Sequence, residues 1–184
     1  MPYAITALFD AATEERLRAA RAALVEAGLC DPAVAEVRPH LSFSILPGLD
    51  AEALRPRLRA WCYERAPLAL QIAAVGSFPG DEGVVYLAPV VTERLLETNA
   101  SLDRLLAEAG GAPEGTYRAG SWVPHVTVGI HLASEHIPAA LGLLREADVF
   151  YTGVLTQLAV AEFPPLTELY TFPLRGEGAA SAAG

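Results

Sequence analysis

The chain has 184 residues, a hydrophobic content of 52% and a formal net charge of -9. This length and hydrophobic content predict a globular protein with its own core. Proteins that bind many phosphates along a nucleic-acid duplex depend on positive surface charge, which this acidic chain lacks. A long nucleic-acid duplex is therefore not expected as a partner.

The first half of the chain predicts the order strand, helix, strand, helix, strand. Runs of strand-forming residues place the strands at 3–9, 39–45 and 68–78, and Pro79-Gly80 ends the last of them. The first helix is expected to begin at an N-cap Thr13 and run to about residue 27, and the second to run from an N-cap Asp50 through residue 64.

The second half predicts the same order again, with one more strand at its end. Strands are expected at 84–91, 124–130, 153–163 and 169–173, and helices at 92–109 and 138–145. Thr92 is the expected cap of the first of these helices, and Gly110-Gly111 ends it. The small and polar residues 176–184 predict a disordered tail.

The sequence gives no sign of a membrane or an oxidising compartment. Uncharged stretches are too short or too interrupted for a spanning helix, and the N-terminus resembles a first strand and not a secretion signal. Cys30 and Cys62 stand far apart without metal or disulfide spacing, which indicates two reduced thiols. We therefore expect a cytoplasmic protein with no membrane partner.

An internal repeat joins the two halves. Residues 85 positions apart correspond in three places: Pro39-His40 with Pro124-His125, Ser42 with Thr127, and Phe78-Pro79 with Phe163-Pro164. The repeat predicts an α+β fold built from a duplicated unit, with two antiparallel-rich sheets flanked by helices around a central cleft on a pseudo-twofold axis. We expect one bilobal domain over 1–175, with lobes of roughly 1–80 and 81–175 between which strands could be exchanged.

The two repeated motifs carry the residues suited to catalysis. Side chains at i and i+2 of a strand share a face, so His40 and Ser42 point one way, as do His125 and Thr127. Two imidazoles can act as general base and general acid near neutral pH, each contributing roughly 10²–10⁴-fold, while the hydroxyls donate to phosphate oxygens. This set predicts phosphoryl chemistry without a metal.

Each motif alone is short and degenerate, and taken singly it is better explained by ordinary strand histidines beside Ser or Thr. The repetition at one shared offset, which places two of only four histidines alike, favours a functional pair.

The segments PHLSFSI at 39–45 and PHVTVGI at 124–130 resemble those of the 2H phosphoesterases, which include 2′-5′ RNA ligase-like proteins and cyclic nucleotide phosphodiesterases. The resemblance extends to about residue 173. It implies a bilobal α+β fold, acid and base roles for His40 and His125, and phosphate binding by Ser42 and Thr127. It also implies an enzyme of RNA processing that acts on a 2′,3′-cyclic phosphate or a 2′-5′ phosphodiester, with reverse ligation as a variant.

The resemblance does not choose among these reactions or decide which histidine is the acid. The expected partner is a small nucleotide or an RNA terminus, bound by a monomer. Two other hypotheses stay open: a non-catalytic module that binds nucleotides or RNA ends, and an acidic structural domain in which the motif is idle.

Residues near the second motif are weaker candidates. Tyr117, Arg118 and Trp122 precede it and could supply a stacking surface and a cation for substrate, although Trp122 could equally cover a core edge and Arg118 be a surface charge. His131 would share the face of His125 if the strand continued past Gly129.

The sequence predicts no metal site and no cofactor. His125, His131 and His136 fall within a dozen residues, but their spacing is poor for metal coordination and neither strand motif contains Asp or Glu. The glycines form neither a phosphate-binding loop nor a dinucleotide fingerprint, and no Gly-x-Ser-x-Gly segment is present.

Overall fold

The computed structural model describes residues 2–113, 115–118, 120–163 and 166–176, and it confirms the predicted α+β class. Over these ranges the strands are β1 (Tyr3–Phe9), β2 (His40–Leu46), β3 (Leu68–Ser77), β4 (Val85–Pro89), β5 (Val126–Gly129), β6 (Thr152–Glu162) and β7 (Thr167–Pro173). The helices are α1 (Ala11–Glu26), α2 (Ala51–Tyr63), α3 (Glu93–Glu108) and α4 (Ile137–Glu146), with 3-10 turns η1 (Pro32–Ala35), η2 (Gly115–Tyr117) and η3 (Ser134–His136).

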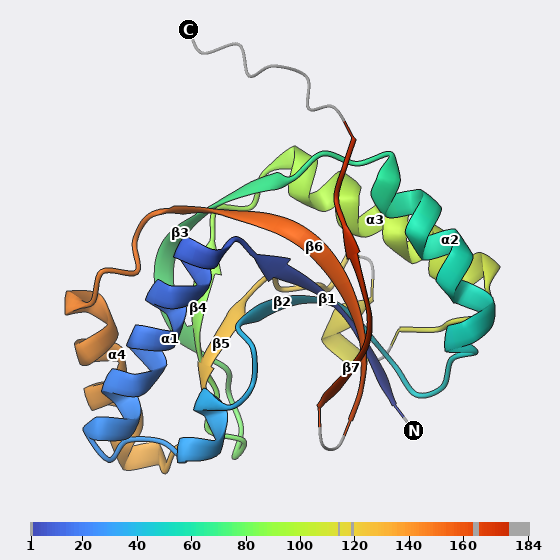
Figure 1. The fold of residues 1–184 in the computed structure, drawn as a ribbon. Helices are drawn as coiled ribbons and strands as arrows, with labels where there is room; N and C mark the ends of the chain where they lie inside the picture. The colour runs from blue at the N-terminus through green and yellow to red at the C-terminus, as the bar shows by residue number, and fades with distance from the viewer. Residues whose placement is uncertain (1, 114, 119, 164–165, 177–184) are drawn as a thin grey trace, which may run out of the picture.

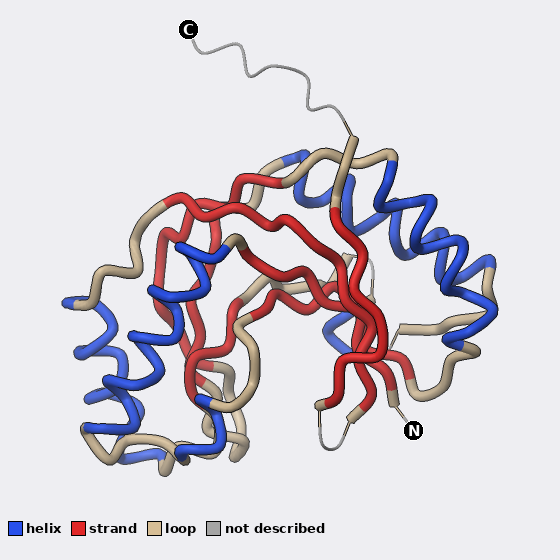
Figure 2. The backbone as a smooth tube through the Cα atoms, viewed as in Figure 1, coloured by secondary structure: helices blue, strands red, loops and turns tan. Residues whose placement is uncertain are grey.

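The strands form one antiparallel sheet in the order β2-β1-β6-β3-β4-β5, with β7 pairing with β6. The sheet is strongly curved (Figure 2). The sheet has two parts, and the first residues of β3 and β6 join them, since Leu68–Gln71 pairs with residues 152–155. The two sheets predicted from the sequence are therefore two parts of a continuous one.

Each part of the sheet takes a strand from the other half of the sequence. The third strand of the second half, β6, pairs with β1, where Ile5 lies opposite Val160. The third strand of the first half, β3, pairs with β4, where Gly76 lies opposite Tyr86. Neither half of the chain closes its own sheet.

The helices are exchanged in the same way (Figure 1). Helix α1 of the first half lies beside α4 and contacts β5, while α3 of the second half contacts β2 and lies beside α2. We call β1, β2, β6, β7, α2 and α3 the first lobe, and β3, β4, β5, α1 and α4 the second lobe. The two lobes therefore do not coincide with the two halves of the sequence.

Alternation along β2 and β5 sets which side chains reach the space between the lobes. Leu41 and Phe43 are buried in β2, and Val126 and Val128 are buried in β5, whereas the residues between them are partly exposed. Burial of these apolar side chains fixes the register of each strand, because a slip of one residue would expose all of them. The motif hydroxyls consequently face away from the core.

Most predicted boundaries agree with the structure to within a few residues, and two differ in ways that matter. Helix α1 is capped by Asp10 and not by Thr13, whose backbone N–H donates to the Asp10 carboxylate. Strand β5 begins at Val126, so His125 lies immediately before it. The predicted tail lies outside the described residues except for Gly176, whose N–H donates to the Arg65 carbonyl. No helix in the described part is long and apolar enough to cross a bilayer.

The cap of α1 also joins the exchanged strands, and this generates a stability prediction. The Asp10 carboxylate accepts from Thr13 N–H (2.9 Å), the Thr13 hydroxyl (2.7 Å) and the N–H of Val154 in β6 (2.9 Å). Asp50 caps α2 through Ala53 N–H. We expect Asp10→Ala to lower the free energy of unfolding by about 2–3 kcal/mol and Asp50→Ala by about 1 kcal/mol.

Urea denaturation of the two variants checks this difference. Because both substitutions remove an aspartate from a helix N-cap, Asp50→Ala is a matched control for the loss of capping and charge. Equal losses would show that the bonds from Val154 and from the Thr13 hydroxyl add nothing to stability.

Candidate active site

The two sequence motifs, from opposite lobes, line one cavity. The cavity has a volume of about 160 Å³, and its walls include His40 and Ser42 from the first lobe and His125 and Thr127 from the second. Tyr117 from η2 lines it as well, together with the less polar residues Ala4, Ile45, Phe163 and Leu166. The exchange of strands therefore brings together four polar side chains that lie up to 87 residues apart in the sequence.

Both histidines are held by the same local bond. Nδ1 of His40 lies 2.8 Å from the Arg38 carbonyl oxygen, and Nδ1 of His125 lies 2.7 Å from the Val123 carbonyl oxygen. A carbonyl only accepts, so Nδ1 carries the hydrogen in each neutral ring and Nε2 keeps its lone pair. The bond fixes the tautomer that a general base requires.

The backbones of the two hydroxyl residues are also anchored alike, each by a side chain that is distant in the sequence. The Ser42 carbonyl accepts from the Trp122 indole N–H at 3.0 Å, and the Thr127 carbonyl accepts from Arg21 Nη2 at 2.7 Å. Trp122 also stacks on Phe43, with ring centroids 5.4 Å apart. These bonds tie the strand of each motif to a segment outside its sheet.

Arg21 is a buried cation that no sequence signal indicated. Its side chain is 2% exposed, and its guanidinium donates to the carbonyls of Val34, Val37 and Thr127. Arg21 Nε has no hydrogen-bond partner in the described residues. Burial lowers the pKa of Arg21 to about 10, so it stays charged at neutral pH. It ties the segment before His40 to the strand of Thr127.

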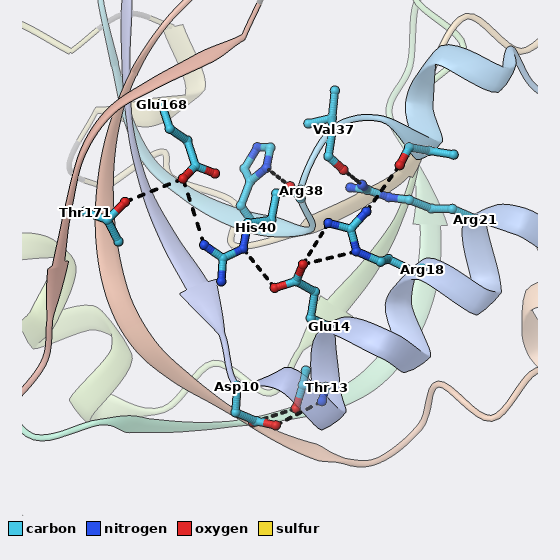
Figure 3. Close-up of polar contacts among 11 residues, drawn as sticks. Asp10, Thr13, Glu14, Arg18, Arg21, Val37, Arg38, His40, Glu168 and Thr171 are labelled. Atoms are coloured by element: carbon cyan, nitrogen blue, oxygen red, sulfur yellow. Dashed lines mark hydrogen bonds and ion pairs between the residues drawn. The ribbon is translucent and has the colours of Figure 1, made fainter.

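Arg38 fixes the same segment from the other side, as Figure 3 shows. Its Nε donates to the Glu14 carboxylate on α1 at 2.8 Å, and its Nη1 lies 3.9 Å from Glu168 on β7. Burial raises the pKa of Glu14, but the bonds from Arg38 and Arg18 outweigh burial and lower it overall. Arg38 thus links the two lobes beside the carbonyl that orients His40.

Burial favours the neutral form of both imidazoles. The pKa of His40 falls to about 4, mainly through burial and further through the positive charges of Arg21 and His125, against the raising effect of the Arg38 carbonyl. Burial also lowers the pKa of His125 below its ordinary value, again opposed by its backbone bond. At neutral pH the cavity therefore presents two neutral rings.

The surroundings of His125 are aromatic, which the sequence did not predict. Its ring centroid lies close to three others: Phe78 at 4.8 Å, Tyr86 at 5.5 Å and Tyr117 at 6.5 Å. Phe78 belongs to the repeated Phe-Pro pair, so the repeat marked it, although only the turn between β3 and β4 brings it against His125. These rings pack around the imidazole and restrict the directions in which His125 can point.

The other predicted site residues divide into two groups. Tyr117 lines the cavity, near the Ser42 hydroxyl, and the exposed Arg118 lines an adjoining hollow with Tyr117 and Ile45. Trp122 does not line either space: it is 9% exposed and packs on the core, which agrees with the interpretation of it as a core edge. Its indole holds the backbone of Ser42 in place.

The remaining histidines lie away from the cavity. Strand β5 ends at Gly129, and His131 adopts a positive φ of 60° and is exposed, so it does not share the face of His125. His136 ends η3 and precedes α4, and it is partly buried. In the described residues no group of three His, Cys, Asp or Glu side chains could hold a metal ion.

The low pKa of His40 generates a prediction about stability and pH. In the unfolded chain a histidine titrates near about 6.5, whereas folded His40 titrates at about 4. Between these two pH values the imidazole of residue 40 is protonated in the unfolded state and neutral in the folded state. The stability that His40 contributes by staying neutral is therefore fully present above about pH 6.5. The free energy of unfolding falls as the pH drops from about 6.5 toward 4.

Urea denaturation at several pH values measures this slope. The His40→Gln variant, which cannot titrate, should lose less stability than the wild type over the same window. A parallel fall in both proteins would contradict the low pKa of His40.

Solved structures with similar folds span almost the whole chain. Escherichia coli LigT, solved in complex with 3′-AMP, is 17% identical with a TM-score of 0.66, covering 95% of this chain and 99% of its own. TT0787 of Thermus thermophilus is 20% identical with a TM-score of 0.58, covering 97% and 100%. Kluyveromyces marxianus Usb1 is 12% identical with a TM-score of 0.56, covering 94% and 97%. At these identities the similarity establishes the fold.

A search of curated protein sequences gives no match. The sequence does match a family model, that of the 2′-5′ RNA ligase superfamily, over residues 9–163. That match contains both histidine motifs and most of the chain, and with the shared fold it shows that the chain belongs to the 2′-5′ RNA ligase superfamily of 2H phosphoesterases.

Proposed function

We propose that this protein is a metal-independent phosphoesterase that opens a 2′,3′-cyclic phosphate or cleaves a 2′-5′ phosphodiester of a small nucleotide or an RNA end. The observation that carries the proposal is the pair of imidazoles, from His40 and His125, that line one small cavity with Nδ1 hydrogen-bonded to backbone. Membership in the superfamily supports a phosphoesterase-type activity.

The two imidazoles divide the proton transfers of hydrolysis. One neutral ring takes a proton from water through Nε2 as the water oxygen bonds to phosphorus. The other, protonated, gives its proton to the ribose oxygen that leaves. Hydroxyls of Ser42 and Thr127 donate to the non-bridging phosphate oxygens, whose charge grows in the transition state. The product carries one phosphate monoester and one free ribose hydroxyl.

The proposed chemistry requires one proton on the histidine pair, and the anionic substrate helps to supply it. A phosphate between the rings favours the charged imidazolium, so binding raises a pKa that burial had lowered. Without substrate, the singly protonated pair predominates between the pKa of His40, about 4, and that of His125, which lies below its ordinary value.

Cavity size and charge support a small ligand. A space of about 160 Å³ suits one phosphate group with its ester oxygens, and the net charge of -9 disfavours a long polyanion. Crystal structures of E. coli LigT contain 3′-AMP, ATP and NADP+, which supports a nucleotide ligand here as well. Since one chain supplies both motifs, we expect a monomer to be active.

Two alternatives compete with hydrolysis. Ligation of 2′-5′ ends would use the same groups in reverse, because the acid of one direction is the base of the other. A module that only binds nucleotides would use the cavity without turnover. The fixed tautomers favour an enzyme, since binding alone does not require Nε2 to be kept free of hydrogen.

Kinetics of single and double variants test the proposal. With 2′,3′-cyclic mononucleotides and 2′-5′ dinucleotides as substrates, His40→Ala and His125→Ala should each remove most of kcat. The double variant should lose little more than the worse single one, because the pair acts as a unit. Ser42→Ala and Thr127→Ala should each raise the barrier by about 1–3 kcal/mol, the value of one hydrogen bond to a charged group.

His136→Ala, at a histidine outside the cavity, is the control and should match the wild type. Excess chelator should leave all rates unchanged; activity lost to chelator and restored by zinc or manganese would give the histidines a ligand role instead. Full activity in both single alanine variants would refute the two-histidine mechanism.

The pH dependence of kcat/KM gives a separate prediction. This ratio reports the free enzyme, so its profile should be bell-shaped with a maximum between about 4 and 6.5, on the acid side of neutrality. The limbs belong to the coupled pair and not to one ring each. A maximum above about pH 7 would contradict the lowered pKa values.

A further inference from the structure

A second, larger cavity opens from the wall of the first. It has a volume of about 700 Å³ and shares Ile45, Tyr117, His125, Thr127 and Phe163 with the small cavity. From these residues it extends to the turn between β3 and β4. A phosphate held between the two histidines would therefore have the rest of its molecule in this space.

The lining of the larger cavity is aromatic and almost without charge. Phe78, Tyr117 and Phe163 provide three rings. Among the described residues of the lining, Glu82 is the only acidic one, and no Lys or Arg accompanies it. Rings of this kind stack on nucleobases of any type, while a lone carboxylate repels further phosphates and accepts hydrogen bonds from N–H groups.

Glu82 sits on a turn that is fixed from both sides. Its carbonyl accepts from His131 N–H at 2.9 Å, and the carbonyl of Gly83 accepts from Leu132 N–H at 3.1 Å. Gly83 has a φ of +57°, and a Cβ there would lie 2.1 Å from the Leu132 oxygen, so only glycine fits. The exposed carboxylate is thus carried on rigid backbone at the cavity edge.

Glu82 and Tyr117 line the same cavity. Burial raises the pKa of Tyr117, and the negative charge of Glu82 raises it further, against the lowering effect of the bond to Ser42. A hydrogen-bond acceptor and a stacking ring are thus available to one ligand in this cavity.

We propose that the larger cavity binds the base of the substrate and that Glu82 selects guanine. Guanine presents two neighbouring donors, N1–H and the N2 amino group, which match the two oxygens of a carboxylate. Adenine and cytosine place a ring-nitrogen acceptor beside their amino group, and uracil flanks its N–H with two carbonyls, so each of them sets a lone pair against the carboxylate. The inference rests on the proposed function for the position of the phosphate.

The test compares kcat/KM for the 2′,3′-cyclic phosphates of guanosine, adenosine, cytidine and uridine. The wild type should prefer the guanosine substrate by about tenfold in kcat/KM. This corresponds to the lower end of the range for hydrogen bonds to a charged group, because Glu82 is exposed to solvent. Glu82→Gln should lose about tenfold on guanosine and change little on the other three. Asp81→Asn, the same change of charge one residue away and outside the lining, should keep the wild-type pattern.

Calorimetric titration with the four nucleoside 3′-monophosphates repeats the comparison without turnover. Preference for 3′-GMP in a protein that hydrolyses nothing would support the base site and refute the proposed enzyme. Turnover of all four substrates at similar rates, or equal losses on all four in Glu82→Gln, would overturn the role of Glu82 while leaving the enzyme intact.

Discussion

The pairing of β1 with β6, and of β3 with β4, is the constraint on which the rest of this structure depends. The first lobe is completed by β6, β7 and α3 of the second half of the chain, and the second lobe by β3 and α1 of the first half. The space between the lobes is therefore set by the sheet itself and not by a flexible linker. Since β2 and β5 lie in opposite lobes of that sheet, the positions of the two histidines depend on it directly.

The duplicated halves each supply one histidine and one hydroxyl to the site, and small departures from symmetry give the two histidines different neighbours. The carbonyls that orient the two histidines belong to Arg38 and Val123, which occupy equivalent positions 85 residues apart. The side chain of Arg38 links the lobes through carboxylates, whereas Val123 is an exposed apolar residue. A buried cation lies near His40, and aromatic rings surround His125. Identical bonds thus hold the two rings in different surroundings.

The sequence was sufficient for what depends on periodicity and repetition. Alternation of apolar residues placed Ser42 and Thr127 on one face of their strands, and the shared offset joined the two motifs. The role of Arg21 could not be predicted, because a basic residue on an amphipathic helix ordinarily faces water. The burial of Arg21 depends on backbone carbonyls from distant segments of the chain. Glu82 and Trp122 lie on turns, and the local sequence pattern does not define the path of a turn. The positions of these two side chains could therefore not be predicted from the sequence.

The exchanged strands also bear on how such a chain could originate. A single ancestral unit of strand, helix, strand, helix, strand would leave β1 paired with β2 alone, so two copies would have to associate and swap their third strands to complete each sheet. The site of that homodimer would lie on its twofold axis, with two identical histidines in identical surroundings. Fusion through the short turn at residues 78–84 would free the copies to diverge. Only then could one imidazole acquire a neighbouring guanidinium and the other a ring of aromatic side chains.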